Sequence, residues 1–323
     1  MDQRHAIMVI TLLLMLCGCR GDKDGPGEDP SAEFPIMVSA EAEIPSTRSA
    51  LPSGMPDRLK VYTTARIGGE RVVVMDGYEV KYMDGNWTYG SETQAMKFWS
   101  HNAEYYTFTS GAPTEAVTSI DENGMTLQLE NNDSYAAMAC KPIKIENGTP
   151  EFGKTVNLHF TYSHCMVRVA FVNNAEAPTA LTDITLAPTS PITSKGTLTY
   201  TYDESGNTTT LLTSTETSST PMVYADVTIP ANSSDAILSD TRYYCVPDAA
   251  NPTDWQIALT IDGEAKNFTF VNNRTWESGK NYIYIFSWQN KVLKLVDIIT
   301  QDTYFDCNDI IPGDKFSITD MTE

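Results

Sequence analysis

At residues 156–171 the sequence reads Val-Asn-Leu-His-Phe-Thr-Tyr-Ser-His-Cys-Met-Val-Arg-Val-Ala-Phe, and this stretch decides the fold class. Apolar residues alternate with polar ones, which indicates β-strands because successive strand side chains point to opposite faces. In residues 156–162 the apolar set occupies even positions, whereas in residues 165–171 the set best placed for burial occupies odd positions. One unbroken strand would turn half of these side chains toward water. We therefore predict a β-bulge or a tight crossover at Ser163-His164.

Similar strand-like runs occupy most of the chain. Within residues 78–89, Asp84-Gly85 separates two alternating runs and predicts a hairpin with a two-residue turn. Within residues 117–129, Asn123-Gly124 predicts a second hairpin. The other runs, rich in Thr, Tyr and Val, are residues 156–162, 166–172, 181–186, 196–202, 208–213, 222–229, 241–246, 255–261, 266–271, 282–288 and 292–299. These patterns are typical of β-sandwiches, with at most one short helical turn at residues 92–98.

The polar segment at residues 173–178, Asn-Asn-Ala-Glu-Ala-Pro, is the best candidate for a domain boundary. It ends in proline and follows a long predicted strand. The segment separates residues 34–172 from residues 178–323, and each part has an ordinary size for a β-sandwich domain. The predicted fold class is therefore all-β, with two β-sandwich domains in tandem and no clear internal repeat.

Residues 1–18 have the features of a signal peptide, because an apolar run at residues 6–16 stands before Cys17, Gly18 and Cys19. The run is shorter than the roughly 20 apolar residues that a membrane-spanning helix needs. A small residue followed by cysteine resembles the bacterial lipoprotein signal, in which the cysteine becomes the lipidated first residue of the mature chain. We predict lipidation at Cys19, with Cys17 as the alternative acceptor. An ordinary cleaved signal peptide is the competing interpretation.

The chain is strongly acidic, with 22 Lys plus Arg residues against 42 Asp plus Glu residues. Such a surface repels nucleic-acid phosphates and anionic lipid headgroups, so no nucleic-acid partner is expected. Residues 19–33 are rich in Gly, Pro and acidic residues and are predicted to form a lipidated tether. Acyl chains on Cys19 would then attach the protein to the outer membrane.

Patterns typical of catalysis or metal binding are poorly represented. His159 and His164 lie five positions apart, so an unbroken strand would place them on opposite faces, and only the phase change could reunite them as a metal site. Asp302, Asp306 and Asp309 could coordinate Ca²⁺, although a solvated acidic loop fits them better. No G-x-S-x-G, HExxH or P-loop pattern is present. We predict a protein that is not an enzyme, with no catalytic, cofactor-binding or metal-binding residues and no cofactor.

Four cysteines, Cys140, Cys165, Cys245 and Cys307, remain after the predicted processing. No CxxC pair occurs, which argues against a zinc site or a redox dithiol. An exported chain could form one or two disulfides among these residues, and buried free thiols fit equally well. The sequence does not determine which of the cysteines, if any, form disulfides.

Aromatic residues are frequent, at 16 Tyr, 11 Phe and 5 Trp, and most alternate within predicted strands as core residues would. Trp87, Tyr89, Trp99, Tyr105 and Tyr106 could instead form a platform on which sugars stack. A platform of that kind would favour an adhesin that binds glycans or host proteins.

Several motifs, taken in order, resemble the fimbrillin family of Bacteroidales lipoproteins, which includes subunits of type V pili. They are the lipobox ending in Cys19, residues 34–40, 46–48, 80–89, 97–99, 103–109, 156–164 and 167–169, and Gly-Lys-Asn-Tyr-Ile-Tyr at residues 279–284. The resemblance implies two transthyretin-like Greek-key β-sandwich domains. The chain departs from the family near its end, where residues 298–303 run into an acidic tail in place of an aromatic closing strand.

The resemblance also implies assembly through a removable N-terminal strand. The alternating residues of that strand are Phe34, Ile36, Val38, Ala40 and Ala42. An arginine-specific protease would cut between Arg48 and Ser49, in a polar, turn-prone loop. Departure of the strand would expose an apolar groove, which a strand of another subunit would fill by β-augmentation.

The predicted function is a structural subunit of surface fimbriae that serves adhesion, with other pilus subunits as partners in a homopolymer or heteropolymer. The predicted location is the outer membrane, lipid-anchored and surface-exposed, and the fimbrium after processing. The alternative is a monomeric outer-membrane lipoprotein that keeps its N-terminal strand and binds glycans or host proteins. The sequence does not distinguish stalk, tip and anchor subunits.

Overall fold

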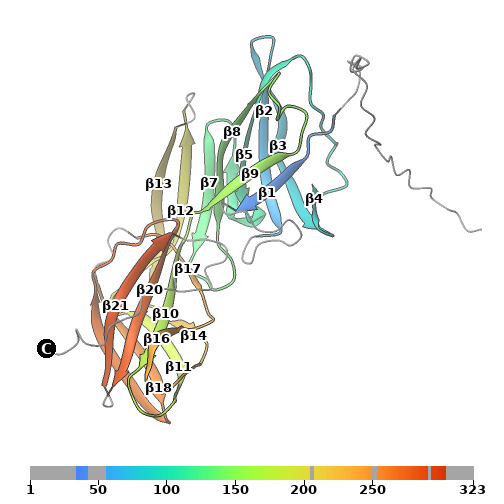
Figure 1. Ribbon diagram of the computed structural model, residues 1–323. Coiled ribbons are helices and arrows are strands. Elements are labelled where there is room, and N and C mark those ends of the chain that lie inside the picture. Colours follow the sequence, from blue (N-terminus) through green and yellow to red (C-terminus); the bar gives the residue numbers. More distant parts are fainter. Residues whose placement is uncertain (1–33, 43–55, 204–206, 249–252, 290–291, 303–323) are drawn as a thin grey trace, which may run out of the picture. The chain divides into compact units, whose positions relative to one another are not determined.

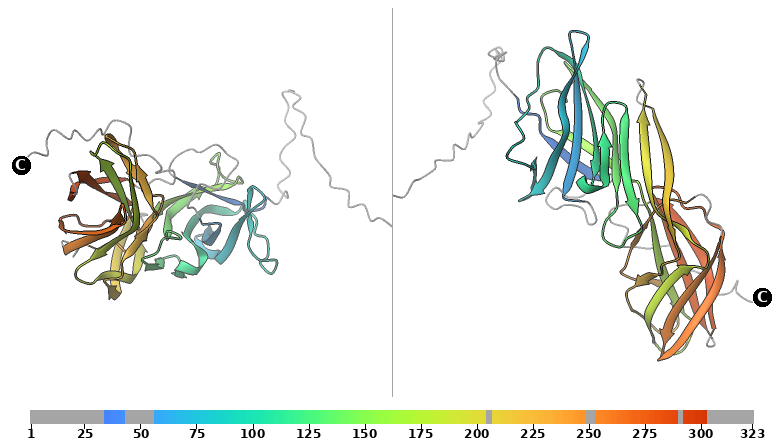
Figure 2. Two further views of the ribbon diagram at one scale, coloured as in Figure 1. Left: turned by 90° about the horizontal axis from the view of Figure 1, so that it is seen from below. Right: turned by 180° about the vertical axis from the view of Figure 1, so that it is seen from behind.

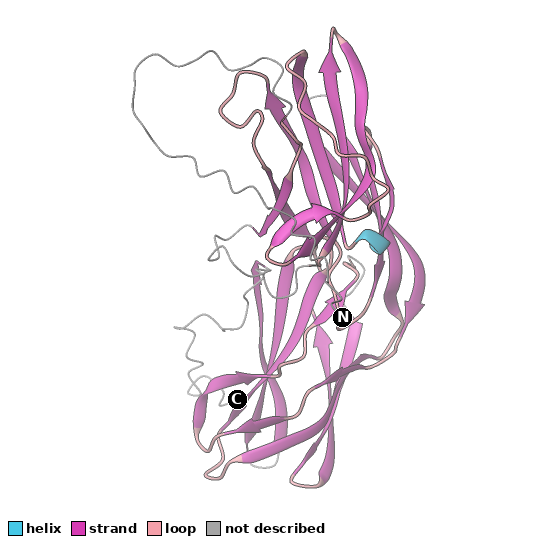
Figure 3. Cartoon of the chain, turned by 90° about the vertical axis from the view of Figure 1, so that its right-hand side faces the viewer, coloured by secondary structure: helices cyan, strands magenta, loops and turns pink. Residues whose placement is uncertain are grey.

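The computed structural model describes residues 34–42, 56–203, 207–248, 253–289 and 292–302. Strands account for almost all regular structure in these ranges (Figure 3), and the helical element among them is a 3-10 helix at Thr114–Ala116. The all-β prediction is confirmed. The short helical turn considered at residues 92–98 does not form, because residues 92–94 make a turn and a bend and residues 95–97 have no regular structure. Within the described ranges, no helix is long and apolar enough to span a membrane.

Two sheets use strands from the first half of the chain (Figure 1). Sheet I contains, in spatial order, β1 (Val38–Ala42), β9 (Val156–Tyr162), β8 (Met138–Glu146), β5 (Ala103–Ala112), β2 (Arg58–Ile67), β3 (Glu70–Met83) and β4 (Asn86–Tyr89). Sheet II contains β13 (Thr208–Ser218), β12 (Ile192–Tyr202), β7 (Gly124–Glu130) and β6 (Val117–Ile120).

Two further sheets are built mainly from the second half. Sheet III contains β16 (Ser233–Leu238), β10 (Cys165–Asn173), β20 (Lys280–Gln289) and β21 (Val292–Asp302), and β17 (Tyr243–Cys245) also pairs with β10. Sheet IV contains β14 (Met222–Tyr224), β11 (Thr179–Pro188), β18 (Thr253–Ile261) and β19 (Glu264–Asn272), and β15 (Val227–Ile229) also pairs with β11.

The buried apolar side chains form separate cores that follow these sheets. The core of sheet I includes Leu59, Trp99 and Phe108, and a smaller core joins β7 and β12 of sheet II to Ala137 and Ala139. A third core lies between sheets III and IV, where inward-facing residues of both sheets pack together as in a sandwich. The alternating apolar pattern of the sequence thus corresponds to sheet faces that are buried against one another.

The first predicted hairpin is confirmed in β3 and β4. Met83 and Asn86 are cross-strand partners on either side of the turn. Asp84 (φ 52°) and Gly85 (φ 83°) both occupy the left-handed region, as the two central residues of a type I′ turn require. The local sequence therefore determines the register of this hairpin.

The second predicted hairpin joins β6 to β7, with Ile120 opposite Met125. Its connection is closed by the carboxylate of Asp121, which accepts hydrogen bonds from the N–H groups of Asn123 and Gly124 at 2.7 and 3.1 Å. The aspartate satisfies two backbone donors that the turn would otherwise leave without a partner.

The predicted change of phase at Ser163-His164 is a crossover between two sheets. β9 ends at Tyr162 in sheet I, and β10 begins at Cys165 in sheet III. The chain therefore exchanges one set of neighbours for another: the alternate apolar residues of β9 pack in the core of sheet I, and those of β10 from Cys165 to Phe171 pack in the core between sheets III and IV. β10 is buried on both faces, because Ala170 and its neighbours on the second face pack in a small additional core.

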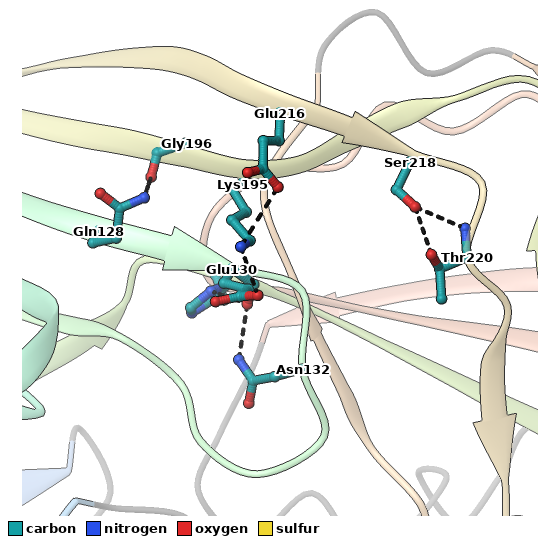
Figure 4. A network of polar contacts seen from close by, with 9 residues as sticks. Gln128, Glu130, Asn132, Lys195, Gly196, Glu216, Ser218 and Thr220 are labelled. Atoms are coloured by element: carbon teal, nitrogen blue, oxygen red, sulfur yellow. Dashed lines mark hydrogen bonds and ion pairs between the residues drawn. The ribbon is translucent and has the colours of Figure 1, made fainter.

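Strand pairing crosses the predicted boundary at residues 173–178 in both directions. β10 precedes it yet pairs with β16, β17 and β20, and β12 follows it yet pairs with β7 (yellow beside green in Figure 2). Lys195 of β12 lies between the carboxylates of Glu130 and Glu216, at 3.3 and 3.5 Å (Figure 4). The division into two folding units at this boundary stays a prediction.

Candidate functional site

The N-terminal segment at residues 34–42 forms backbone hydrogen bonds with two other segments, β9 and residues 97–99. β1 pairs in parallel with β9, from Val38 opposite Val156 to Ala42 opposite Phe160. Just before β1, the N–H of Ile36 donates to the carbonyl of Lys97 at 2.7 Å, and the N–H of Trp99 donates to the carbonyl of Phe34 at 2.9 Å. The segment at residues 34–42 therefore satisfies backbone groups of two segments that are distant in sequence.

Alternate side chains of this segment enter the core of sheet I. Ile36 is 1% exposed and Val38 is 5% exposed, and Ala40 packs against the same core. Phe34 is 41% exposed and meets His101 edge to face, with ring centroids 6.2 Å apart. The side chain of Ala42 lies outside the described residues.

The buried side chains of the segment sit over an apolar floor from β3 and β4, which includes Met75, Val80 and Trp87. The hydroxyl of Tyr89 donates to the carbonyl of Ile36 at 2.9 Å and accepts the N–H of Lys97 at 3.2 Å. Withdrawal of the segment would uncover this floor and leave the edge of β9 that faces β1 without backbone partners, which is the geometry that strand addition requires.

The processing residues of the prediction fall outside the described ranges. Arg48 and Ser49 belong to residues 43–55, between β1 and β2, and Cys19 belongs to residues 1–33. Their roles stay predictions.

The aromatic platform considered from the sequence is not formed. Trp87, Trp99 and Tyr106 are buried in the core of sheet I, where the rings of Trp99 and Tyr106 pack 4.8 Å apart. Tyr89 and Tyr105 are half-buried. The alternating pattern that marked these residues as aromatic strand positions did not reveal which face each ring occupies.

A second candidate site is a groove on the face of sheet I opposite the Phe108 side chain, with a cavity volume of about 380 Å³. We call it the Tyr–Thr groove. Alternate residues of β2 and β5 line it: Tyr62, Thr64, Arg66, Tyr105, Thr107 and Thr109. The lining also includes Arg71, Lys144, Tyr202 and the carboxylates of Asp121, Glu122 and Asp203. Sequence reasoning missed this site because it draws on strands and turns that are distant along the chain.

Hydrogen bonds join sheet II to sheet I at one end of the Tyr–Thr groove. The hydroxyl of Tyr62 donates to Glu122 at 2.8 Å, and Thr109 donates to the hydroxyl of Tyr202 at 3.3 Å. Burial, aided by the hydrogen bond to Glu122, raises the pKa of Tyr62 well above its usual range. Tyr62 therefore stays a neutral donor at any physiological pH.

The histidines that sequence reasoning considered for metal binding are separated. His164 is 1% exposed; its Nδ1 accepts the N–H of Ala137 at 2.8 Å, and its Nε2 donates to the carbonyl of Glu130 at 3.2 Å. Both ring nitrogens are thus engaged, whereas His159 is exposed on β9. Among the described residues, no group of three or more His, Cys, Asp or Glu side chains could hold a metal ion.

The acidic cluster near the end of the chain is described only in part. Asp302 forms an ion pair with Lys280 at 2.6 Å across β20 and β21. Asp306 and Asp309 lie outside the described residues.

The three cysteines in the described ranges, Cys140, Cys165 and Cys245, are buried free thiols. Cys165 and Cys245 are cross-strand partners, and the Sγ of Cys165 donates to the carbonyl of Cys245 at 3.4 Å. Burial raises the pKa of Cys140 to about 12 and that of Cys165 above its usual range. Cys307 lies outside the described residues.

Comparison with known protein families gives one match. The family described as Fimbrillin-like matches residues 52–302. Among curated proteins, none matches the sequence.

Solved structures of low sequence identity share the fold. A candidate cell adhesion protein from Bacteroides uniformis is 13% identical, with 83% of this chain and 97% of that chain covered and a TM-score of 0.52. A second, from Bacteroides ovatus, is 10% identical, with 84% and 98% covered and a TM-score of 0.53. Since the family match spans well over half of the sequence, the chain belongs to the fimbrillin-like family.

Proposed function

We propose that this protein is a structural subunit of surface fimbriae that is assembled by proteolysis and donor-strand exchange and serves adhesion. Membership of the fimbrillin-like family supports a fimbrial or adhesive role at the cell surface. The observation that carries the finer proposal is the segment at residues 34–42, which fills an apolar floor and satisfies two separate backbone edges. These are the properties of a strand that another strand can replace.

Cleavage after Arg48 would cut the covalent link between β1 and β2. The strand would not leave unaided, because burial of Ile36 and Val38 alone contributes roughly 1.5–3 kcal/mol for each side chain. An incoming strand of another subunit, with apolar residues at alternate positions, would recover that free energy and the hydrogen bonds of β9. The free energy of packing on the apolar floor and β9 is therefore nearly unchanged by the exchange. The proteolytic step makes the exchange irreversible.

N-terminal sequencing of the protein extracted from intact cells tests the proposal. We expect Ser49 as the first residue, and we expect SDS-resistant ladders of the surface protein. Arg48→Ala should abolish both, whereas Arg58→Ala, at an exposed arginine paired with Glu79, should change neither. A wild-type protein that always begins at Cys19 would contradict the proposal.

We also propose that Cys19 carries the lipid that holds the precursor at the outer membrane. Labelling of cells with a palmitate analogue should mark the wild-type protein and Cys17→Ser equally. Cys19→Ser should remain unlabelled. Loss of label in Cys17→Ser alone would reassign the acceptor to Cys17.

A second candidate function is a monomeric surface lipoprotein that retains β1 and binds glycans or host proteins. The Tyr–Thr groove favours it, because tyrosine rings and hydroxyl groups line a concave surface of ligand size. A retained N-terminus together with monomeric behaviour and binding on a carbohydrate array would support this function over fimbrial assembly.

A further inference from the structure

The Tyr–Thr groove holds three cations and three carboxylates, and two of the cations, both arginines, face each other across a strand pair. Arg66 of β2 and Arg71 of β3 are cross-strand partners, so two like charges stand directly opposite each other, which destabilises a sheet. Among the described residues, neither guanidinium has a carboxylate within 4.0 Å, although the chain carries 42 Asp and Glu residues. An anionic ligand would relieve this repulsion.

An aromatic ring and a third cation adjoin the two arginines. Tyr105 of β5 is the cross-strand partner of Arg66, and its ring is half-buried. The ammonium group of Lys144 lies 4.3 Å from the centroid of that ring and also forms an ion pair with Glu146 at 2.8 Å. A planar guanidinium suits a carboxylate, because its N–H donors form a fork that matches two oxygens. The ring beside it offers an apolar face for the C–H groups of a sugar.

The next row of side chains supplies hydroxyl groups. Thr64 and Thr107 are cross-strand partners, and each hydroxyl can donate one hydrogen bond and accept others. At the end near sheet II, the exposed carboxylate of Glu122 can accept hydrogen bonds from ligand hydroxyls beside the one that it receives from Tyr62. A cavity of about 380 Å³ is within the range of small-molecule sites.

We propose that the Tyr–Thr groove binds an acidic saccharide, a sugar that bears a carboxylate. Arg66 and Arg71 bind the carboxylate, Tyr105 packs against the sugar ring, and Thr64, Thr107 and Glu122 bind hydroxyl groups. The proposal rests on the adhesive part of the proposed function, for which it names the class of receptor. It does not depend on cleavage at Arg48 or on strand exchange.

Calorimetric titration of the detergent-solubilised full-length protein tests this proposal, with 3′-sialyllactose as the acidic probe and lactose as its neutral counterpart. We expect 3′-sialyllactose to bind and lactose to bind at least about tenfold more weakly, a difference of about 1.4 kcal/mol. The double variant Arg66→Gln/Arg71→Gln should lose at least about tenfold in affinity for 3′-sialyllactose. Arg58→Gln, on the same strand but outside the groove, should bind like the wild type.

Thermal unfolding of the same variants separates loss of binding from loss of fold. Because the two arginines repel each other, Arg66→Gln/Arg71→Gln should unfold no lower than the wild type. Lys144→Gln changes an exposed side chain and should still weaken binding of 3′-sialyllactose. Equal affinity for the two probes, no binding of either, or full affinity in the double arginine variant would overturn the proposal.

The assay also distinguishes this proposal from the proposed assembly. Binding by the purified chain needs no polymer, so a negative titration leaves the N-terminal sequence and the SDS-resistant ladders as independent readouts. Conversely, binding of 3′-sialyllactose by a chain that always retains Cys19 would support saccharide binding in the Tyr–Thr groove and contradict assembly by strand exchange.

Discussion

The buried imidazole of His164 should make the fold less stable in acid, and replacement of His164 by glutamine should remove this contribution to the loss of unfolding free energy at low pH. Burial disfavours the imidazolium form and lowers the pKa of His164 to about 4, although the carbonyl of Glu130 opposes the shift. In the unfolded chain the pKa of a histidine is about 6.5. Between these values the unfolded chain binds a proton that the folded chain does not, so acid favours unfolding.

The sign and size of the effect follow from the two pKa values. The contribution of neutral His164 is fully present above about pH 6.5 and is lost as the pH falls toward 4. From about pH 7.5 to about pH 4.5, the free energy of unfolding should fall by about 2 to 3 kcal/mol on account of this residue. That amount is a large fraction of the total stability of an ordinary domain.

Urea unfolding at the two pH values measures this loss in each variant separately. His164→Gln retains every carboxylate of the wild type, so the difference between their two losses isolates the histidine. His159→Gln changes an exposed imidazole on β9 and is the matched control. Between the two pH values it should lose as much free energy of unfolding as the wild type does. If His164→Gln loses as much stability as the wild type between the two pH values, His164 is not kept neutral in the fold and the reasoning is refuted.

Three other outcomes are expected. Ile36→Ala should cost about 2–5 kcal/mol in denaturant unfolding because it empties a buried position, whereas Met37→Ala, at a half-buried position, should cost less; equal costs would contradict the difference in burial. Gly124→Ala should lower the melting temperature by several degrees, because its Cβ would overlap the carbonyl oxygen of Tyr200; an unchanged melting temperature would show that the two strands can separate freely. Iodoacetamide should label the peptide that contains Cys140 in denaturant and leave it unlabelled in the native protein, as mass spectrometry would show; rapid native labelling would mean that the thiol is accessible.

Features that depend on neighbouring residues could be predicted from the sequence. Asp84-Gly85 specifies its turn through the two left-handed φ angles, so the first hairpin needs no distant contact. The phase change at Ser163-His164 located the crossover, because burial of both halves in one sheet is geometrically excluded. Neither feature required knowledge of the partner strands.

Features that depend on distant pairing could not be predicted in this way. The parallel pairing of β10 with β20 joins residues more than a hundred positions apart, and the sequence of neither strand identifies the other as its partner. Arg66 and Arg71 are recognised as a like-charge pair only once the register of β2 and β3 is known. Likewise Trp99 and Tyr105 each stand next to another aromatic residue in the sequence, and only the packing shows that the first is buried and the second borders a groove.

The parallel register of β1 and β9 has a mechanical consequence. Under a force directed along the axis of β1, the hydrogen bonds to β9, from Val38 to Ala42, would share the load in shear and would not open one after another. Sliding the segment at residues 34–42 by one residue would also move the side chains of Ile36 and Val38 away from the apolar floor. A strand paired in this way would resist tension along its axis more strongly than stepwise replacement from one end.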